Sequence, residues 1–236
     1  MAAAAARARP PRGNSRPRSA LRATPSRRPT AVLFDWDGTL VDSAEASYRC
    51  YVRLFDSYGL GFDRALFART YSPNWHRTYE AVGLAPDRWP EADHRWLEHY
   101  CAEESPLVPG AREALRRLDE AGIAQGIVTS GDRSRVSREL SGLHLERYFR
   151  TVVFGGDARE RKPHPEALLL ALGRMAVAPS RAAYVGDSPE DVEMARAAGV
   201  RAVGVPGGFP NREALAASRP DVLAPDLLAA VNALVG

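Results

Sequence analysis

Short, nearly continuous apolar runs along the chain alternate with stretches of helical periodicity. The apolar runs lie at 31–34, 124–128, 151–154, 182–185 and 201–205. The helical patterns lie at about 110–121, 132–141, 163–173 and 190–198. A short apolar run at 222–223, followed by a helix near 225–234, is expected to complete one edge of the sheet. Strands of a parallel sheet are buried on both faces and are therefore apolar throughout. The pattern predicts an α/β fold with helices on both faces of a parallel sheet.

One long segment interrupts this alternation after the first predicted strand. Residues 43–106 are too many for a crossover, show no apolar strand run, and contain several helical stretches and three of the four tryptophans. We therefore expect a small helical domain over 43–106. It would be inserted into a core formed by 31–42 and 107–236.

The basic charge of the chain is concentrated at its N-terminus. Residues 1–30 hold eight arginines and no acidic residue, so the remaining chain has 24 basic and 29 acidic residues, a balance of about −5. That balance argues against a nucleic-acid-binding face on the core. The tail has almost no large apolar side chain, and we expect it to be disordered. Four interpretations of the tail stay open: a start that is non-native or earlier than needed, a tail without function, a transit peptide, and nucleic-acid binding through residues 1–30.

Length, hydropathy and cysteine content narrow the class of protein further. A chain of 236 residues can bury its own core without disulfides or structural metal. No run approaches 18 apolar residues, which excludes a transmembrane helix. Cys50 and Cys101 lack the spacing of a metal site, and we expect two buried thiols in a reducing, cytoplasmic compartment. A monomer or a homodimer is expected.

Polar side chains follow four of the predicted strands, at the point where each strand ends. Because the carboxyl ends of parallel strands meet at one edge of an open sheet, where ligands bind, we expect these residues to lie together. In strand order they are Asp35, Asp37 and Gly38; Thr129 and Ser130; Lys162; and Asp187 and Asp191.

The four aspartates indicate a metal site. Asp35 and Asp37 could form a simple turn, but two carboxylates at the end of a buried strand repel each other and need a cation or a shared proton. Asp187 and Asp191 could instead cap the next helix. Together the four acids make an oxygen-rich site that suits Mg²⁺.

The polar residues at the remaining strand ends favour the binding of an anion. Thr129 offers a hydroxyl at a helix start, where backbone N–H groups bind anions, although Ser130 or Asp132 could merely cap that helix. Lys162 is the only lysine among the 32 basic residues. A surface lysine is the ordinary interpretation, but a compact ammonium beside a phosphate and a carboxylate would explain its retention.

Combined, these groups predict phosphoryl transfer. Asp35 would be the nucleophile that forms an aspartyl-phosphate. Asp37 would act as general acid and then base, and we expect the neighbouring carboxylate to raise its pKa. Mg²⁺ would be held by Asp35, Asp187 and the Asp37 carbonyl, with Asp191 in the same acidic set. The phosphoryl group would be held by Gly38, Thr129, Ser130 and Lys162.

Four segments resemble the motifs of the haloacid dehalogenase superfamily, in the same order. The match extends over about 30–236, and in this family the insertion would be a helical cap. The resemblance implies a Rossmann-like core whose cap closes over small phosphomonoesters. The segments are Asp-Trp-Asp-Gly-Thr-Leu-Val-Asp-Ser at 35–43, Ile-Val-Thr-Ser at 127–130, Lys162-Pro163, and Gly-Asp-Ser-Pro-Glu-Asp at 186–191.

Within the superfamily, 155–157 and 161–165 look most like the phosphoglycolate phosphatases. The expected function is therefore Mg²⁺-dependent hydrolysis of a small phosphorylated metabolite. Dehalogenases of the superfamily lack the second aspartate, so Asp37 argues against that reaction. A sugar-phosphate mutase and a non-catalytic binder of a phosphorylated ligand stay as alternatives. Four polar cap residues are expected to be solvated rather than to touch substrate: Arg49, Arg69, His76 and Arg77.

Overall fold

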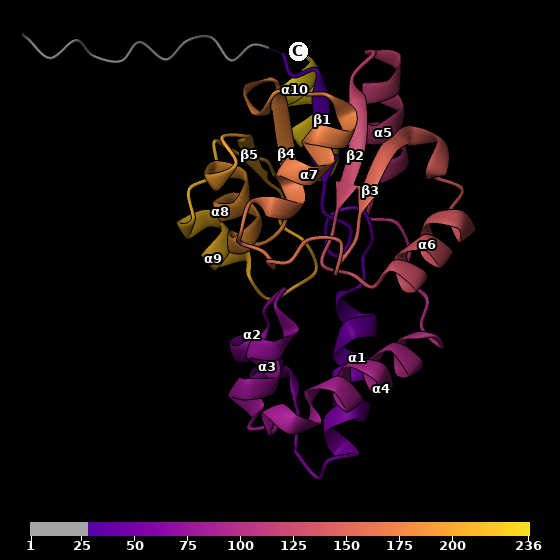
Figure 1. The fold of residues 1–236 in the computed structure, drawn as a ribbon, viewed down its shortest axis with the longest axis vertical. Helices are drawn as coiled ribbons and strands as arrows, with labels where there is room; N and C mark the ends of the chain where they lie inside the picture. Colours follow the sequence, from indigo (N-terminus) through magenta and orange to yellow (C-terminus); the bar gives the residue numbers. More distant parts are fainter. Residues whose placement is uncertain (1–27) are drawn as a thin grey trace, which may run out of the picture.

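The computed structural model describes residues 28–236, so the predictions for the tail fall almost entirely outside it. Figure 1 shows two lobes, one built on a sheet and one made of helices α1 to α4. None of the helices in the described part combines the length and apolar composition that a bilayer crossing requires.

The larger lobe contains one parallel sheet of six strands in the order β3-β2-β1-β4-β5-β6. Ala31 of β1 pairs with Ala124 on one side and Ala182 on the other, which makes β1 central. The strand order reverses between β1 and β4. The strands are β1 (Ala31–Phe34), β2 (Ala124–Val128), β3 (Phe149–Val153), β4 (Ala182–Gly186), β5 (Arg201–Gly204) and β6 (Val222–Leu223).

Helices cover both faces of the sheet, which confirms the predicted α/β class. Val32 and Phe34 of β1 pack with α5, α6 and α10, whereas Ala31 and Leu33 pack with α7, α8 and α9. Every position of β1 is buried, and this explains its uninterrupted apolar run. The helices are α5 (Ala111–Glu120), α6 (Arg133–Gly142), α7 (Glu166–Met175), α8 (Pro189–Ala197), α9 (Arg212–Ala217) and α10 (Leu227–Val235).

The element boundaries differ from the prediction in three places. Strand β3 lies at Phe149–Val153 and not at 151–154, and α9 was not expected, because six residues rich in alanine give no clear periodicity. Helix α7 begins at Glu166 and not at 163. Pro163 and Pro165 disfavour helical backbone at the residues before them, so the helix starts only after the second proline.

The helical insertion confirms the expectation of a small α-helical lobe after the first strand. It contains α1 (Ala44–Asp56), α2 (Arg64–Thr70), α3 (Trp75–Val82) and α4 (Trp89–Tyr100) around an aromatic core. Its two connections to the sheet lie side by side, since Val41 bridges Leu107 and the Asp42 N–H donates to the Pro106 carbonyl at 2.8 Å. Domain boundaries at 43 and 106 stay a prediction.

The expectation of two buried thiols is wrong for one of them. Cys50 on α1 is buried, but Cys101 is exposed. Cys101 directly follows the buried Tyr100 at the end of α4, and one residue along a helix turns the side chain to a different face.

Candidate active site

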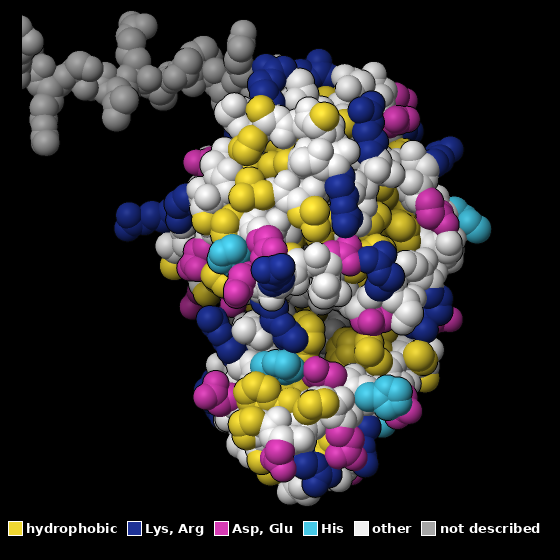
Figure 2. Space-filling view, in the orientation of Figure 1, with side chains coloured by type: hydrophobic (Ala, Val, Ile, Leu, Met, Phe, Trp, Pro, Cys, Tyr) yellow, Lys and Arg dark blue, Asp and Glu magenta, His cyan; other side chains and the backbone are white. Residues whose placement is uncertain are grey.

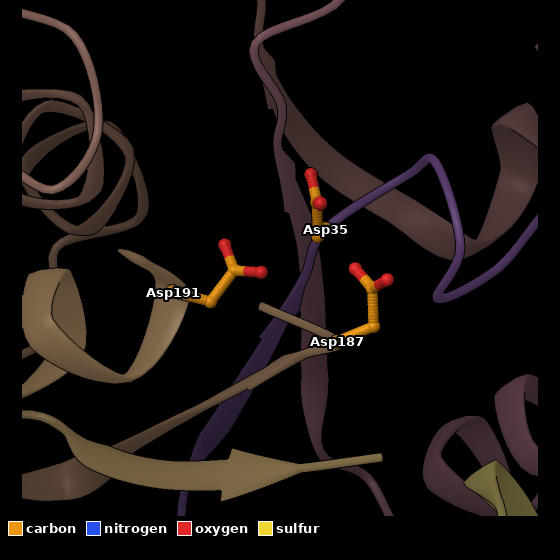
Figure 3. A group of neighbouring side chains, drawn as sticks. All are labelled: Asp35, Asp187 and Asp191. Atoms are coloured by element: carbon orange, nitrogen blue, oxygen red, sulfur yellow. The ribbon is translucent and has the colours of Figure 1, made fainter. Parts of the chain in front are cut away.

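Three acidic side chains meet at the carboxyl end of the sheet. Asp35 follows β1 and Asp187 follows β4, so they flank the reversal of strand order where α/β sheets bind ligands. Asp191 reaches the same place from the first turn of α8. One carboxylate oxygen of each lies within 4.8 Å of the others. Figure 3 shows the three side chains around a common space.

This cluster of three acids is buried, and its electrostatics favour a cation. Burial raises the pKa of Asp35 to about 7, an effect that Lys162 opposes and Asp191 reinforces. Burial and the charges of Asp191 and Asp35 raise the pKa of Asp187 well above its usual range. Asp187 Oδ2 is buried and accepts no hydrogen bond from the described residues. A buried carboxylate oxygen without a partner is destabilising unless a ligand contacts it.

The donor set fits a divalent ion with a preference for oxygen. When all three acids are ionised, they and the single Lys162 ammonium leave two negative charges, and only oxygen ligands are offered. The backbone also approaches the acids closely: a Cβ at Gly38 or Gly207 would lie 2.4 or 2.7 Å from Asp187 Oδ2. The glycines therefore leave room at a carboxylate that larger side chains would crowd. These observations support Asp35, Asp187 and Asp191 as the residues that would hold Mg²⁺.

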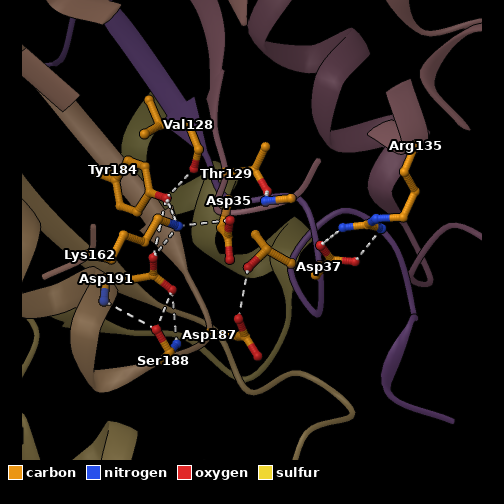
Figure 4. A network of polar contacts seen from close by, with 12 residues as sticks. Asp35, Asp37, Val128, Thr129, Arg135, Lys162, Tyr184, Asp187, Ser188 and Asp191 are labelled. Carbon is orange, nitrogen blue, oxygen red and sulfur yellow. Dashed lines mark hydrogen bonds and ion pairs between the residues drawn. The ribbon is translucent and has the colours of Figure 1, made fainter. Parts of the chain in front are cut away.

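Lys162 connects the acidic cluster to the sheet (Figure 4). Its Nζ donates to Asp35 Oδ1, Asp191 Oδ1 and the Tyr184 hydroxyl, each at 2.8 Å. The side chain is buried, which alone would lower its pKa, but Asp191 and Asp35 raise the pKa instead. Lys162 is therefore a charged ammonium that touches the predicted nucleophile, and not a surface lysine.

Asp191 has a structural role as well as its place in the cluster. Its Oδ2 accepts a hydrogen bond from the Ser188 N–H at 3.1 Å, and its own N–H donates to the Ser188 hydroxyl oxygen at 3.2 Å, which forms a capping box at the start of α8. Its Oδ1 remains directed at Lys162. The helix cap and the acidic cluster therefore share one side chain.

Asp37 faces away from the acidic cluster toward a buried arginine. Arg135 Nη1 and Nη2 donate to its two oxygens at 3.0 and 2.5 Å, and Arg135 also pairs with Glu139. Trp36 Nε1 donates to Glu139 at 2.7 Å, so the residue between the two aspartates takes part in this network. Burial would raise the pKa of Asp37, but Arg135 lowers it below its usual value. The expected rise in this pKa is wrong for the present arrangement, because the sequence did not reveal the arginine.

The loop after β2 borders the same site. The Thr129 hydroxyl accepts the Gly131 N–H at 2.9 Å, while Asp132 caps α6, so neither Thr129 nor Ser130 is the cap. Both line the cavity above Asp35. Gly38 is not among the lining residues, and its N–H donates to the Val41 carbonyl at 2.8 Å.

A cavity of about 350 Å³ separates this edge of the sheet from the helical lobe. Figure 2 shows the hollow between the two lobes, with apolar side chains inside it. The four polar cap residues that were expected to be solvated do not line it; Arg49, for example, pairs with Glu103. The lobe instead contributes a mainly aromatic wall: Tyr51, Tyr71, Trp75, Tyr79, Trp96 and Leu97, with Ser47, Ser72 and Asp93.

Sequence reasoning missed two polar residues of the site. Tyr184 lies inside an apolar strand, and only its hydroxyl, which donates to the Val128 carbonyl at 2.8 Å, distinguishes it from the core. Arg135 is one of many arginines, and nothing in its local pattern separates a buried one from a solvated one.

Comparisons with known proteins agree with this geometry. A family model described as haloacid dehalogenase-like hydrolase matches residues 32–205. A curated phosphoglycolate phosphatase from Salmonella choleraesuis (strain SC-B67) is 35% identical over 219 residues, which cover 81% of this chain and 87% of the relative.

Two solved structures share the fold. A candidate phosphoglycolate phosphatase from Lactobacillus plantarum superimposes with a TM-score of 0.80 at 24% identity, over 87% of this chain and 99% of that one. A candidate beta-phosphoglucomutase from Thermotoga maritima superimposes with a TM-score of 0.68 at 30% identity, over 86% of this chain and 97% of that one. The chain therefore belongs to the haloacid dehalogenase-like hydrolase family, and the prediction of a family enzyme of the phosphatase type is confirmed.

Proposed function

We propose that this protein is a Mg²⁺-dependent phosphatase that hydrolyses small phosphomonoesters of the phosphoglycolate type through an aspartyl-phosphate. The observation that supports it most strongly is the position of Asp35, which lines a small cavity, contacts Lys162 and lies close to two further buried carboxylates. The curated relatives named phosphoglycolate phosphatases support the substrate class.

Asp35 would supply the attacking oxygen. A carboxylate oxygen of Asp35 bonds to phosphorus as the bond from phosphorus to the ester oxygen breaks, and the alcohol leaves. Water then attacks the aspartyl-phosphate, the bond from phosphorus to Asp35 breaks, and inorganic phosphate is released. Lys162 favours the ionised form of Asp35 against the effect of burial and directs the carboxylate, since its Nζ lies 2.8 Å from Asp35 Oδ1.

Asp37 would move the protons of both steps. It gives a proton to the leaving oxygen in the first step and takes one from water in the second. In the structure it is held by Arg135 in a form that favours the carboxylate. Proton donation therefore requires Asp37 to turn from Arg135 toward the reacting oxygen.

The oxygens of the transferred group would be bound by Thr129, Ser130 and Lys162, which border the cavity or lie directly beneath it. Mg²⁺ held by Asp35, Asp187 and Asp191 would neutralise negative charge on the phosphoryl group. The aromatic wall of the helical lobe would keep bulk water away from the reacting atoms.

The test is phosphate release from a panel of small phosphorylated metabolites, with Mg²⁺ and with EDTA. We expect Mg²⁺-dependent release from one or a few of them. Asp35→Asn should lower kcat by at least about 10⁴-fold, because the nucleophile is lost. The matched control is Asp119→Asn, an exposed aspartate on α5, which should retain wild-type turnover. Turnover near wild type in folded Asp35→Asn would refute the proposal.

A sugar-phosphate mutase is the second candidate, favoured by the 30% identity to the candidate beta-phosphoglucomutase. Such an enzyme would return the phosphoryl group from Asp35 to a sugar instead of to water. A coupled assay for isomerised sugar phosphate separates the two: product sugar phosphate without phosphate release supports the mutase.

A further inference from the structure

One cation at the wall of the cavity has no counter-ion within residues 28–236. Arg161 lines the cavity, yet its side chain makes no hydrogen bond or ion pair in the described part of the chain. The other charged groups of the wall all have partners: Asp35 has Lys162, Asp37 has Arg135, Asp93 accepts from Trp75 and His76, and Asp132 caps α6.

The guanidinium of Arg161 lies over an aromatic ring of the helical lobe. Its Cζ is 4.1 Å from the centroid of the Trp75 ring, and the Trp75 Nε1 donates to Asp93 at 2.6 Å, which fixes the ring. A cation–π contact does not use up the guanidinium N–H groups, so those of Arg161 remain available for an anion. The neighbouring Lys162 points inward to Asp35, so consecutive residues of one loop place one cation on the predicted nucleophile and another on the wall of the cavity.

The surroundings of Arg161 favour a small anionic ligand. The cavity of about 350 Å³ is at the small end of ligand pockets, and the wall around Trp75 is mainly aromatic. A planar guanidinium binds carboxylate and phosphate oxygens through paired hydrogen bonds. The free N–H groups of Arg161 are therefore the feature of this wall that distinguishes a charged substrate tail from a neutral one.

We propose that Arg161, which lies over the Trp75 ring, binds a second anionic group at the far end of the phosphomonoester and selects substrates that have one. The inference rests on the proposed phosphatase function. It assigns specificity to a core loop next to Lys162 as well as to the helical lobe. A carboxylate and a second phosphate share the required chemistry.

The test uses three esters of similar length: phosphoglycolate, the bisphosphate of ethylene glycol, and 2-hydroxyethyl phosphate, in which a hydroxyl replaces the second anion. The wild-type protein should prefer one or both anionic esters in kcat/KM. Arg161→Gln should lower kcat/KM for the preferred ester by about 10- to 100-fold, mostly through KM, as expected for lost charge-assisted hydrogen bonds. The neutral ester should lose much less, and Arg161→Lys should recover part of the preference.

The matched control is Arg159→Gln, an exposed arginine two residues earlier that does not line the cavity. It removes the same charge from the same loop and should leave the preference within twofold of wild type. An equal loss on all three esters in Arg161→Gln would mean that the contact with Trp75 only joins the two lobes, and would overturn the inference. Equal wild-type rates on charged and neutral esters would also overturn it, while leaving the phosphatase in place. If the protein hydrolyses none of the three esters and none of the wider panel of metabolites, the proposed phosphatase function is itself refuted.

Discussion

Arg135 shows how one buried side chain can join the chemistry of a site to the stability of a fold. It lies 5% exposed, contacts Asp37 and Glu139, and packs against the rings of Trp96 and Tyr100. Burial alone would lower its pKa, but the two carboxylates raise the pKa, so it remains charged. The arginine therefore stabilises two half-buried acids that would otherwise lack this counter-ion.

Removal of this arginine should destabilise the protein strongly. We expect Arg135→Met to lower the free energy of unfolding by about 3–5 kcal/mol, because it leaves Asp37 and Glu139 without their counter-ion. Urea unfolding measures the change. Arg133→Met on the same helix is the control: Arg133 is 61% exposed where it pairs with Asp157, and its loss should change stability by less than about 1 kcal/mol. Similar effects of the two substitutions would contradict this account.

Among single residues, those that stand next to the end of a predicted strand could be assigned to the site from the sequence. Those whose role depends on packing against distant parts of the chain could not. Asp35, Asp187 and Lys162 could be predicted because each follows or precedes a recognisable apolar run, and parallel topology then brings them together. Arg135 and Tyr184 reach the site from within a helix and a strand. Their roles depend on the neighbours across the fold, which local pattern does not report.

Among the elements, the loop after β1 is the most constrained. Gly38 has φ +77, a backbone conformation that L side chains rarely adopt, and it approaches both Asp187 and Phe209. The loop closes tightly, since the N–H groups of Leu40 and Val41 donate to the Trp36 carbonyl at 3.0 Å. Its geometry therefore keeps Asp35 and Asp37 in place while allowing Asp187 to approach.

An added methyl group at this loop should affect Mg²⁺ binding beyond its effect on the backbone. Gly59→Ala is a natural control, because Gly59 has φ +69 but nothing within 4 Å, so it reports backbone strain alone, about 1 kcal/mol. Gly38→Ala should destabilise by more than this and should also weaken Mg²⁺ binding at least tenfold, measured by calorimetry. Equal stability and unchanged Mg²⁺ affinity in the two variants would show that the close approach to Asp187 is unimportant.

Elements buried on both faces were the most predictable ones. Strands β1, β2, β4 and β5 were located to within one residue because their apolar runs leave little alternative. The less buried β3, α9 and the start of α7 depend on short-range context. Inside the helical lobe, the sequence indicated helices but not which aromatic residues form its core and which line the cavity. Tyr51 does both, since it packs with Phe55 and also borders the cavity.

For the whole molecule, the acids that would bind the metal ion also lower the stability of the fold when no ion is bound. Asp35, Asp187 and Asp191 are buried together with a single ammonium, so ionising all three without metal would leave uncompensated negative charge in the fold. An ion that binds only the folded state stabilises it in proportion to the logarithm of its concentration. Global stability should therefore depend on Mg²⁺.

We expect one substitution in the cluster to change the melting temperature differently without and with Mg²⁺. In EDTA, Asp187→Asn should raise the melting temperature, because it removes a buried carboxyl group whose ionisation is opposed by burial and by its acidic neighbours and whose Oδ2 has no partner in the described structure. In millimolar Mg²⁺, the wild-type melting temperature should rise and that of the variant should change little. Thermal unfolding of both proteins under both conditions measures this. A variant that is less stable in EDTA, or equally responsive to Mg²⁺, would contradict this expectation.

The paired connections of the helical lobe also bear on how such proteins diversify. The chain leaves the sheet after Val41 and returns at Leu107, and these two residues bridge each other. An exchange of everything between them would need only two neighbouring junctions, and the acids, the lysine and the hydroxyls of the sheet edge would stay untouched. Replacement of the helical lobe at these two junctions would therefore change which substrates the cavity accepts and leave the residues of the reaction in place.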